Sequence, residues 1–394
     1  MLKRRITAVI LVLIFCISNI TVFAQSGDNT KPSELLGAIA YLSENPGRWT
    51  IAAFNAAGAT PDSNAVRELK TAVKGNVKTG YTKITDLAYD ILSASAGGYD
   101  ATNLADHNLI DLLAGRNDML QQGANGPIFA LLALDSCGYP LPDQAKWSRE
   151  NLCEAILTYQ TNDGGFRLDN TMGADVDVTA YALMALSRYS ENAEVSRAID
   201  RAVDWLMQVQ NEDASFSSLG TPCSESTASV IMALISLGIR VYGERFSKDG
   251  ITVYDALLSF QNSDGSFSHI AGGAGNVLAT EQAVMAMGAV CFGKSPFRLA
   301  AVTAPTDTAG ISASFLFFTV GIIVLIYLIL LLVRKIGDRY AKKPSKPDAD
   351  RITNSPESSD SQQQNPWQKG GRTGETKTSC TRLTRYRCAV CQLR

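Results

Sequence analysis

Histidine and strand-forming patterns are what this sequence has least of. The 394 residues include only two histidines, His107 and His269, so a zinc-dependent active site is not expected. Alternation of apolar and polar residues with β-branched side chains is nearly absent, which argues against a β-rich fold. No Gly-x-Ser-x-Gly segment occurs, so the nucleophile elbow of a Ser/His/Asp hydrolase is missing. These absences favour an all-α protein.

The chain contains two apolar segments outside the central domain. Residues 1–24 have a basic start, a short apolar centre and Ala24 at a plausible cleavage position, which predicts a signal peptide. Residues 311–333 contain no charged side chain and are followed at once by Arg334 and Lys335. At about 1.5 Å per residue this run is long enough to cross a bilayer, so it predicts one transmembrane helix.

Charge divides sharply between the parts. Residues 25–310 carry 19 Lys and Arg against 32 Asp and Glu, whereas residues 334–394 carry 14 against 6. The basic segment after the span predicts a cytoplasmic tail, which leaves residues 25–305 as an extracytoplasmic domain. Few large apolar residues occur in 334–394, so this tail is expected to be disordered. The net negative charge of this domain argues against binding to nucleic acids or anionic lipids.

The cysteines leave alternatives open. In an exported domain Cys137, Cys153, Cys223 and Cys291 could form disulfides, and they could equally be core thiols. In the tail, Cys388 and Cys391 have the spacing of a zinc knuckle or redox pair. No second pair or nearby histidine completes such a site.

One short polar segment recurs three times. QTNDGGF (residues 160–166) returns as QNEDASF (210–216) and QNSDGSF (261–267), at steps of 50 and 51 residues. An amphipathic helix precedes the second and third copies, and an Ala-rich helix containing Thr179, Thr227 or Thr280 follows each copy. The shared motif positions are Gln160, Asp163, Gly164, Phe166, Gln210, Asp213, Phe216, Gln261, Asp264, Gly265 and Phe267.

The repeating unit is therefore a helix, a polar turn and a second helix. Residues 93–99, 126–134 and 48–54 are interpreted as weaker upstream copies, so about five or six helix pairs fit between residues 30 and 295. Repeated helix pairs stack because each buries a face that its neighbour leaves open. Ala-rich helices suit a crowded inner layer, which favours closure into a ring.

The repeated turn itself is expected to be structural. Gln160 lies in the last turn of a helix, where its side-chain amide is expected to donate to a free backbone carbonyl. Asp163, Gly164 and Gly165 permit unusual backbone angles, and Phe166 is expected to fold back as an apolar plug. The second copy loses both glycines, which indicates that they help the turn without being indispensable.

This Gln-x-x-Asp-Gly-x-aromatic turn beside helix pairs resembles the repeat of the terpene cyclase and protein prenyltransferase superfamily. The likeness is strong over residues 150–290 and weak over 30–150. It is similar above all to secreted bacterial proteins with prenyltransferase/squalene-oxidase repeats, and through them to the helical domain of cobalamin carriers. The resemblance implies an α/α toroid with a central cavity and a ligand-sized mouth, and does not by itself imply an activity.

The chemistries known in that superfamily are incomplete here. Class II cyclases use Asp-x-Asp-Asp, and the matching segment has Asp175 and Asp177 but ends in Val178. Asp177 is alternatively interpreted as a helix cap. Protein prenyltransferases hold zinc with Asp, Cys and His, and no Asp-x-Cys accompanies either histidine, so no metal site is expected. The thioester motif of complement proteins also lacks its cysteine at Leu278–Gln282.

Three functions remain as hypotheses. The first is a non-catalytic surface module, anchored in the cell membrane, that binds a corrinoid, another bulky small molecule or a partner. Its candidate ligand-binding residues are Asp175, Asp177 and His269. Cobalamin carriers add a β-rich domain, which this chain lacks between Phe297 and residue 311. The alternatives are a surface assembly protein, and an enzyme on isoprenoids or glycans using Asp175 and Asp177, whose Asp-x-Asp pair is absent before Thr227 and Thr280.

Overall fold

A computed structural model describes residues 31–299 of the chain. The predicted signal peptide, the predicted span at 311–333 and the tail with Cys388 and Cys391 lie outside the described residues. Within 31–299, no helix has the length and apolar character needed to cross a membrane. No disulfide joins the four cysteines of this part of the chain.

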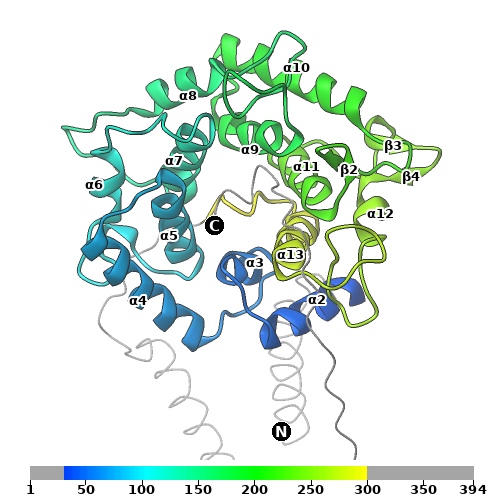
Figure 1. Ribbon diagram of the computed structural model, residues 1–394, viewed down its shortest axis with the longest axis horizontal. Coiled ribbons are helices and arrows are strands. Elements are labelled where there is room, and N and C mark those ends of the chain that lie inside the picture. The colour runs from blue at the N-terminus through cyan, green and yellow to red at the C-terminus, as the bar shows by residue number, and fades with distance from the viewer. Residues whose placement is uncertain (1–30, 300–394) are drawn as a thin grey trace, which may run out of the picture. The chain divides into compact units, whose positions relative to one another are not determined.

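In residues 31–299, twelve α-helices form six pairs, arranged as two concentric layers around one axis (Figure 1). The outer helices are α2 (Ser33–Glu44), α4 (Ser63–Thr79), α6 (Leu109–Ala114), α8 (Arg149–Leu157), α10 (Ala193–Val209) and α12 (Val253–Leu258). The inner helices are α3 (Thr50–Ala56), α5 (Ile84–Ala96), α7 (Asn125–Ser136), α9 (Val176–Leu186), α11 (Ser224–Ser236) and α13 (Val277–Phe292). The predicted α/α toroid of five or six pairs is confirmed, with six.

In the described part of the chain, the strands form two short hairpins in the loops, besides isolated β-bridges. The hairpins pair β1 (Ser217–Ser218) with β2 (Thr221–Pro222), and β3 (Ser247–Lys248) with β4 (Ile251–Thr252). Because every inner helix follows an outer helix, the inner helices all begin at one end of the ring, here called the N-terminal mouth, and end at the other, the C-terminal mouth.

The inner helices are buried on all sides, as expected of helices that are apolar all round. Every residue of α7 and of α9 is buried. Aromatic side chains fill the space near the axis: the Tyr181 ring lies 5.0 Å from that of Phe129 and 6.3 Å from that of Phe297. Phe297 also contacts Trp49, at 5.9 Å between ring centroids. The resemblance implied a central cavity, whereas the axis at this level is packed with side chains.

The repeated turn connects three elements by hydrogen bonds. The backbone N–H of its phenylalanine donates to the threonine hydroxyl of the following inner helix, at 2.8 Å for Phe166 and Thr179. The glutamine amide donates to a carbonyl within the turn and to one in the next repeat: Gln160 to Gly164 and Ala198, both at 2.8 Å. The expected donation from the Gln160 amide to a backbone carbonyl is confirmed, but the acceptors lie in the turn and in the next repeat and not in the preceding helix. Gln160 fastens one repeat to the next.

The same contact closes the ring. Gln261 of the last turn donates to the carbonyl of Glu34 in the first helix, at 2.8 Å. On the inner layer, the Thr50 hydroxyl of α3 donates to the buried Glu281 carboxylate of α13, also at 2.8 Å. The first and last helix pairs therefore meet through the interactions that join neighbouring repeats, which confirms ring closure.

The turn places one residue in the left-handed region of the backbone map. Gly164 has φ 109° and Gly265 has φ 86°, and Ala214 takes the same position in the second copy at φ 62°. Ala214 shows that the second copy tolerates this conformation, at a cost of about 1–2 kcal/mol. At Gly164 and Gly265 an added Cβ would also lie 2.5 Å from the carbonyl oxygen of Arg201 and 2.4 Å from that of Gly37, so these two positions need glycine more strongly. The expected plug is confirmed, since Phe166 is fully buried.

Upstream, two of the three interpreted copies are confirmed as inner helices, α3 and α7. The interpretation of residues 93–99 as a third upstream copy was wrong. Gly97 and Gly98 follow the C-terminus of the inner helix α5 and lead to the next outer helix, so this segment does not correspond to the repeated turn. Its two glycines imitate the motif because helix C-termini also favour glycine.

Replacing Gln210 with alanine should lower the free energy of unfolding by about 1–3 kcal/mol. Its buried amide donates to Ala214 at 3.0 Å and to Phe246 at 3.1 Å, and truncation leaves both carbonyls without that donor. Urea unfolding of the purified chain, followed by circular dichroism, measures the loss. A cost below about 0.5 kcal/mol, as for an ordinary surface position, would contradict this role.

Candidate functional site

The first turns of α9, α11 and α13 carry chemically different residues at equivalent positions. Counting back from the threonine of each repeat, the position four residues earlier holds Asp175, Cys223 and Asn276, and the position two residues earlier holds Asp177, Glu225 and Leu278. The Asp-x-Asp pair therefore has a counterpart in the second repeat, Cys223-x-Glu225. These residues lie at the N-terminal mouth, where inner-helix N–H groups and dipoles favour negative charge.

Asp175 and Asp177 have different roles. Asp175 is the N-cap of α9 and accepts from the backbone N–H of Val178 at 3.0 Å. Its burial raises the pKa of this carboxyl. Asp177 lies within the helix, is 1% exposed, and accepts from the Ser229 hydroxyl of α11 at 3.1 Å. The interpretation of Asp177 as the cap was therefore wrong, because the cap is Asp175.

His269 comes from the loop that follows the third repeated turn. Its Nδ1 lies 2.8 Å from an Oε atom of the buried Glu225 carboxylate. Its carbonyl accepts from the backbone N–H of Ser224 at 3.1 Å, which fixes this loop to the start of α11. Sequence reasoning placed His269 at the surface or the mouth, and the structure places it at the mouth, half-buried beside Glu225.

Cys223 completes a set of three metal-ligand types. The Cys223 sulfur, a Glu225 carboxylate oxygen and a His269 ring nitrogen all lie within 4.8 Å of one another. Burial raises the pKa of the Cys223 thiol to about 12, and the negative charge of Asp177 adds to that shift. We name Asp177, Cys223, Glu225, Ser229 and His269 together the mouth cluster.

The donor set suits zinc, for which Cys, His and carboxylate side chains are the usual ligands. With bonds of about 2.0–2.3 Å, a tetrahedral ion holds its donors about 3.5 Å apart, so small side-chain movements would bring the three into place. No metal site was predicted from the sequence, because neither histidine has an Asp-x-Cys segment near it. The chain instead has Cys-x-Glu, and its histidine comes from the following repeat.

Two further features accompany the mouth cluster. The Ser224 hydroxyl is fully buried, and in residues 31–299 it has no hydrogen-bond partner. The loops leading into α9, α11 and α13 each expose one large apolar side chain: Met172 at 43%, Leu219 at 70% and Ile270 at 46%. An apolar rim thus lies on the loops of the end of the ring that holds the polar cluster, and exposed apolar groups around a polar centre are typical of binding surfaces.

Comparison with known proteins agrees with this architecture. Residues 117–274 and 220–290 match the family model of the prenyltransferase alpha-alpha toroid domain. Over these residues the chain is similar to that toroid domain, as the α/α toroid of the structure also shows. Among solved structures, the chain is similar to ent-copalyl diphosphate synthase from Streptomyces platensis, at 16% identity and a TM-score of 0.42. That match covers 62% of this chain and 50% of the synthase. None of the curated proteins matches the chain.

Proposed function

We propose that the toroid is a membrane-anchored extracytoplasmic binding module that captures its ligand at the N-terminal mouth with the help of a divalent metal ion. The observation that carries this proposal is the convergence of Cys223, Glu225 and His269 at that mouth. The tight packing of the inner helices supports recognition at the mouth over reaction in an internal chamber. The predicted signal peptide and span supply the proposed location.

The mouth residues would hold the ion through one thiolate, one carboxylate and one imidazole. A bound ion of this kind supplies positive charge and an open coordination position for an electron-pair donor of the ligand. Asp177, which accepts from the Ser229 hydroxyl and whose charge acts on the Cys223 thiol, adds negative charge near the ion. Cys223 must lose its proton on binding, so metal uptake should release protons and weaken as pH falls.

Zinc binding tests this proposal directly. The purified full chain in neutral detergent, freed of metal, should bind one Zn²⁺ in competition with a chromophoric chelator. Cys223→Ser and His269→Ala should each weaken binding by about 100-fold or more, because each removes a ligand.

The matched control is the double variant Cys153→Ser and His107→Ala, which removes a thiol and an imidazole away from the mouth cluster. It should bind zinc as the parent chain does. Absence of zinc binding, or binding that survives both mouth substitutions, would rule out the metal site.

The apolar rim favours a bulky ligand, a corrinoid or an isoprenoid diphosphate being candidates, or an apolar partner surface. A thermal-shift screen with and without zinc should separate these cases. A ligand present at 100 times its Kd stabilises the folded state by about 2.7 kcal/mol. No shift with corrinoids, isoprenoid diphosphates or glycan fragments would move the proposal to a protein partner.

One feature favours an enzyme as second candidate. Three protein ligands with an open position are typical of catalytic zinc sites, and Asp177 lies beside the ligands as a potential proton acceptor. If isoprenoid or glycan turnover exists, Asp177→Asn should abolish it while zinc binding persists. Turnover unaffected by that substitution would exclude this role for Asp177.

A further inference from the structure

The C-terminal mouth of the ring is crossed by the last described residues. We call residues 293–299 the C-terminal strap. It runs from the end of α13 across the ring toward α7, where the Leu299 N–H donates to the carbonyl of Ser136 at 2.8 Å (Figure 1). Phe297 is buried at 4% exposure among the aromatic side chains of the axis. The strap thus forms part of the floor of this mouth.

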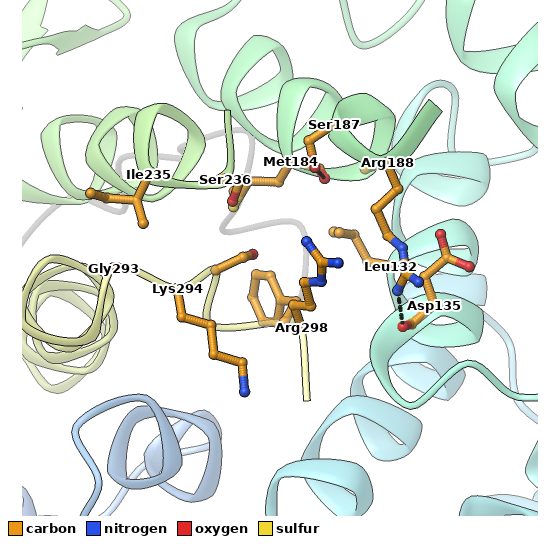
Figure 2. A pocket seen from close by; sticks show the side chains of 13 residues that line it. Leu132, Asp135, Met184, Ser187, Arg188, Ile235, Ser236, Gly293, Lys294 and Arg298 are labelled. Carbon is orange, nitrogen blue, oxygen red and sulfur yellow. Dashed lines mark hydrogen bonds between the residues drawn. The ribbon is translucent and has the colours of Figure 1, made fainter. Parts of the chain in front are cut away.

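A cavity of about 330 Å³ lies between the strap and the C-terminal ends of α7, α9 and α11. In Figure 2 the guanidinium groups of Arg188 and Arg298 lie on either side of this space. Arg188 uses one N–H to donate to the carbonyl of Asp135 at 2.8 Å. In residues 31–299 the Arg298 guanidinium has no hydrogen bond or ion pair. Lys294 also lines the cavity, with its ammonium pointing away from both arginines.

Asp135, the one acid among residues 31–299 that lines this cavity, already has partners for both carboxylate oxygens. One oxygen of Asp135 accepts from Arg149 at 2.7 Å, and the other accepts from the Tyr189 hydroxyl at 2.7 Å. Arg188 donates to the backbone carbonyl of Asp135, whereas Arg149 forms an ion pair with the Asp135 carboxylate. Arg188 and Arg298 therefore contribute two positive charges to the cavity that no carboxylate in its lining balances.

Two of the three serines that line the cavity already donate their hydroxyl protons to backbone carbonyls. Ser187 donates to the carbonyl of Met184, and Ser236 to that of Met232, both at 2.8 Å. The donors left for a ligand are the guanidinium forks, whose planar geometry matches the oxygens of carboxylates and phosphates. Leu132, Met184 and Phe297 add apolar surface for a neighbouring carbon chain.

We infer that this cavity is a binding site for a phosphate group carried on a small organic ligand, held between Arg188 and Arg298. Two unbalanced positive charges fit a phosphate ester, with a charge of about −1.5 to −2 at neutral pH, better than a single carboxylate. The volume is at the lower end of the range of ligand pockets, about 300–1,000 Å³, which suits a headgroup-sized ligand. This site is independent of the metal proposal because it lies at the opposite mouth.

Its position suggests two sources of that phosphate. Residues 300–310 separate the strap from the predicted span, and eleven extended residues reach about 40 Å at most. An anionic lipid headgroup is therefore within reach, as is a soluble phosphate ester. The expectation that the acidic domain would avoid anionic lipids considered net charge alone, whereas this mouth is locally positive.

Binding of two probes to the full chain in neutral detergent tests the inference. Calorimetry with inorganic pyrophosphate reports the soluble source, and mixed micelles with phosphatidylglycerol or phosphatidylcholine report the lipid source. Arg298→Gln should weaken binding of the effective probe about tenfold, and the double variant Arg188→Gln with Arg298→Gln should abolish it.

The matched control is Arg67→Gln with Arg197→Gln, which removes the same charge from exposed positions on α4 and α10. It should bind as the parent chain does. Pyrophosphate binding lost in the mouth variants assigns a soluble ligand, and loss for phosphatidylglycerol alone assigns a headgroup. The inference is overturned if neither probe binds, or if the control loses binding to the same extent. Urea unfolding of each variant shows whether the ring is intact.

Discussion

Replacing Gly265 with alanine is expected to destabilise the ring by about 2–5 kcal/mol. Gly265 has φ 86°, and an added Cβ would lie 2.4 Å from the carbonyl oxygen of Gly37 and 2.5 Å from its carbon. The left-handed conformation costs an alanine about 1–2 kcal/mol. The clash meets backbone of the first helix, which has to move, at a further cost of about 1–3 kcal/mol.

Gly272 provides the matched control. It has φ 73°, and no atom lies within 4 Å of its added Cβ. Gly272→Ala should therefore carry the conformational cost without the clash, about 1–2 kcal/mol. Urea unfolding of the two variants beside the parent chain measures the difference. Equal losses would mean that the contact between Gly37 and Gly265 does not hold the ring closed.

Much of this fold could be predicted from the sequence because the same motif occurs in three successive repeats. In each unit the phenylalanine follows the glutamine by six residues and the threonine follows the phenylalanine by 11 or 13, and each has a defined bond in the structure. What the repeat cannot reveal is the partner of its side-chain amide. Gln160 bonds Ala198, 38 residues away, and only the stacking of neighbouring units brings them together.

The candidate site was harder to predict, for a related reason. The acidic position before Thr179 returns as Glu225 before Thr227, and alignment of the two inner helices on these threonines would have revealed it. The approach of His269 to Glu225 spans 44 residues and depends on the packing of the loop before α13 on α11. The strap was unpredictable in the same sense, because Phe297 follows the last repeat and belongs to no periodic pattern.

Glu281 is expected to make the closure of the ring depend on pH. Its carboxyl crosses the inner seam from α13 to α3 and accepts from the Thr50 hydroxyl. Burial raises the pKa of Glu281 from 4.5 to about 7, although hydrogen bonds from Thr50 and from the backbone at Trp49 partly oppose the shift. The folded state therefore binds this proton more tightly than the unfolded state does.

The direction in which pH changes the stability follows from linkage between protonation and folding. A raised pKa in the folded state gives stability that is fully present below about pH 4.5 and is lost as pH rises through about 7. A difference of about 2.5 pKa units corresponds to about 3 kcal/mol. Because other buried carboxyls of the chain also titrate, the informative quantity is the difference between Glu281→Gln and the parent chain at each pH.

Glutamine at position 281 keeps the shape of the side chain and removes its titration. The free energy of unfolding of Glu281→Gln, relative to the parent chain, should rise by about 3 kcal/mol between pH 4.5 and pH 8. Glu154→Gln, at an exposed position of α8, should show a nearly constant difference over that range. A flat difference for Glu281→Gln as well would mean that solvent reaches this carboxylate. The closure of the seam between α3 and α13 would then not depend on pH.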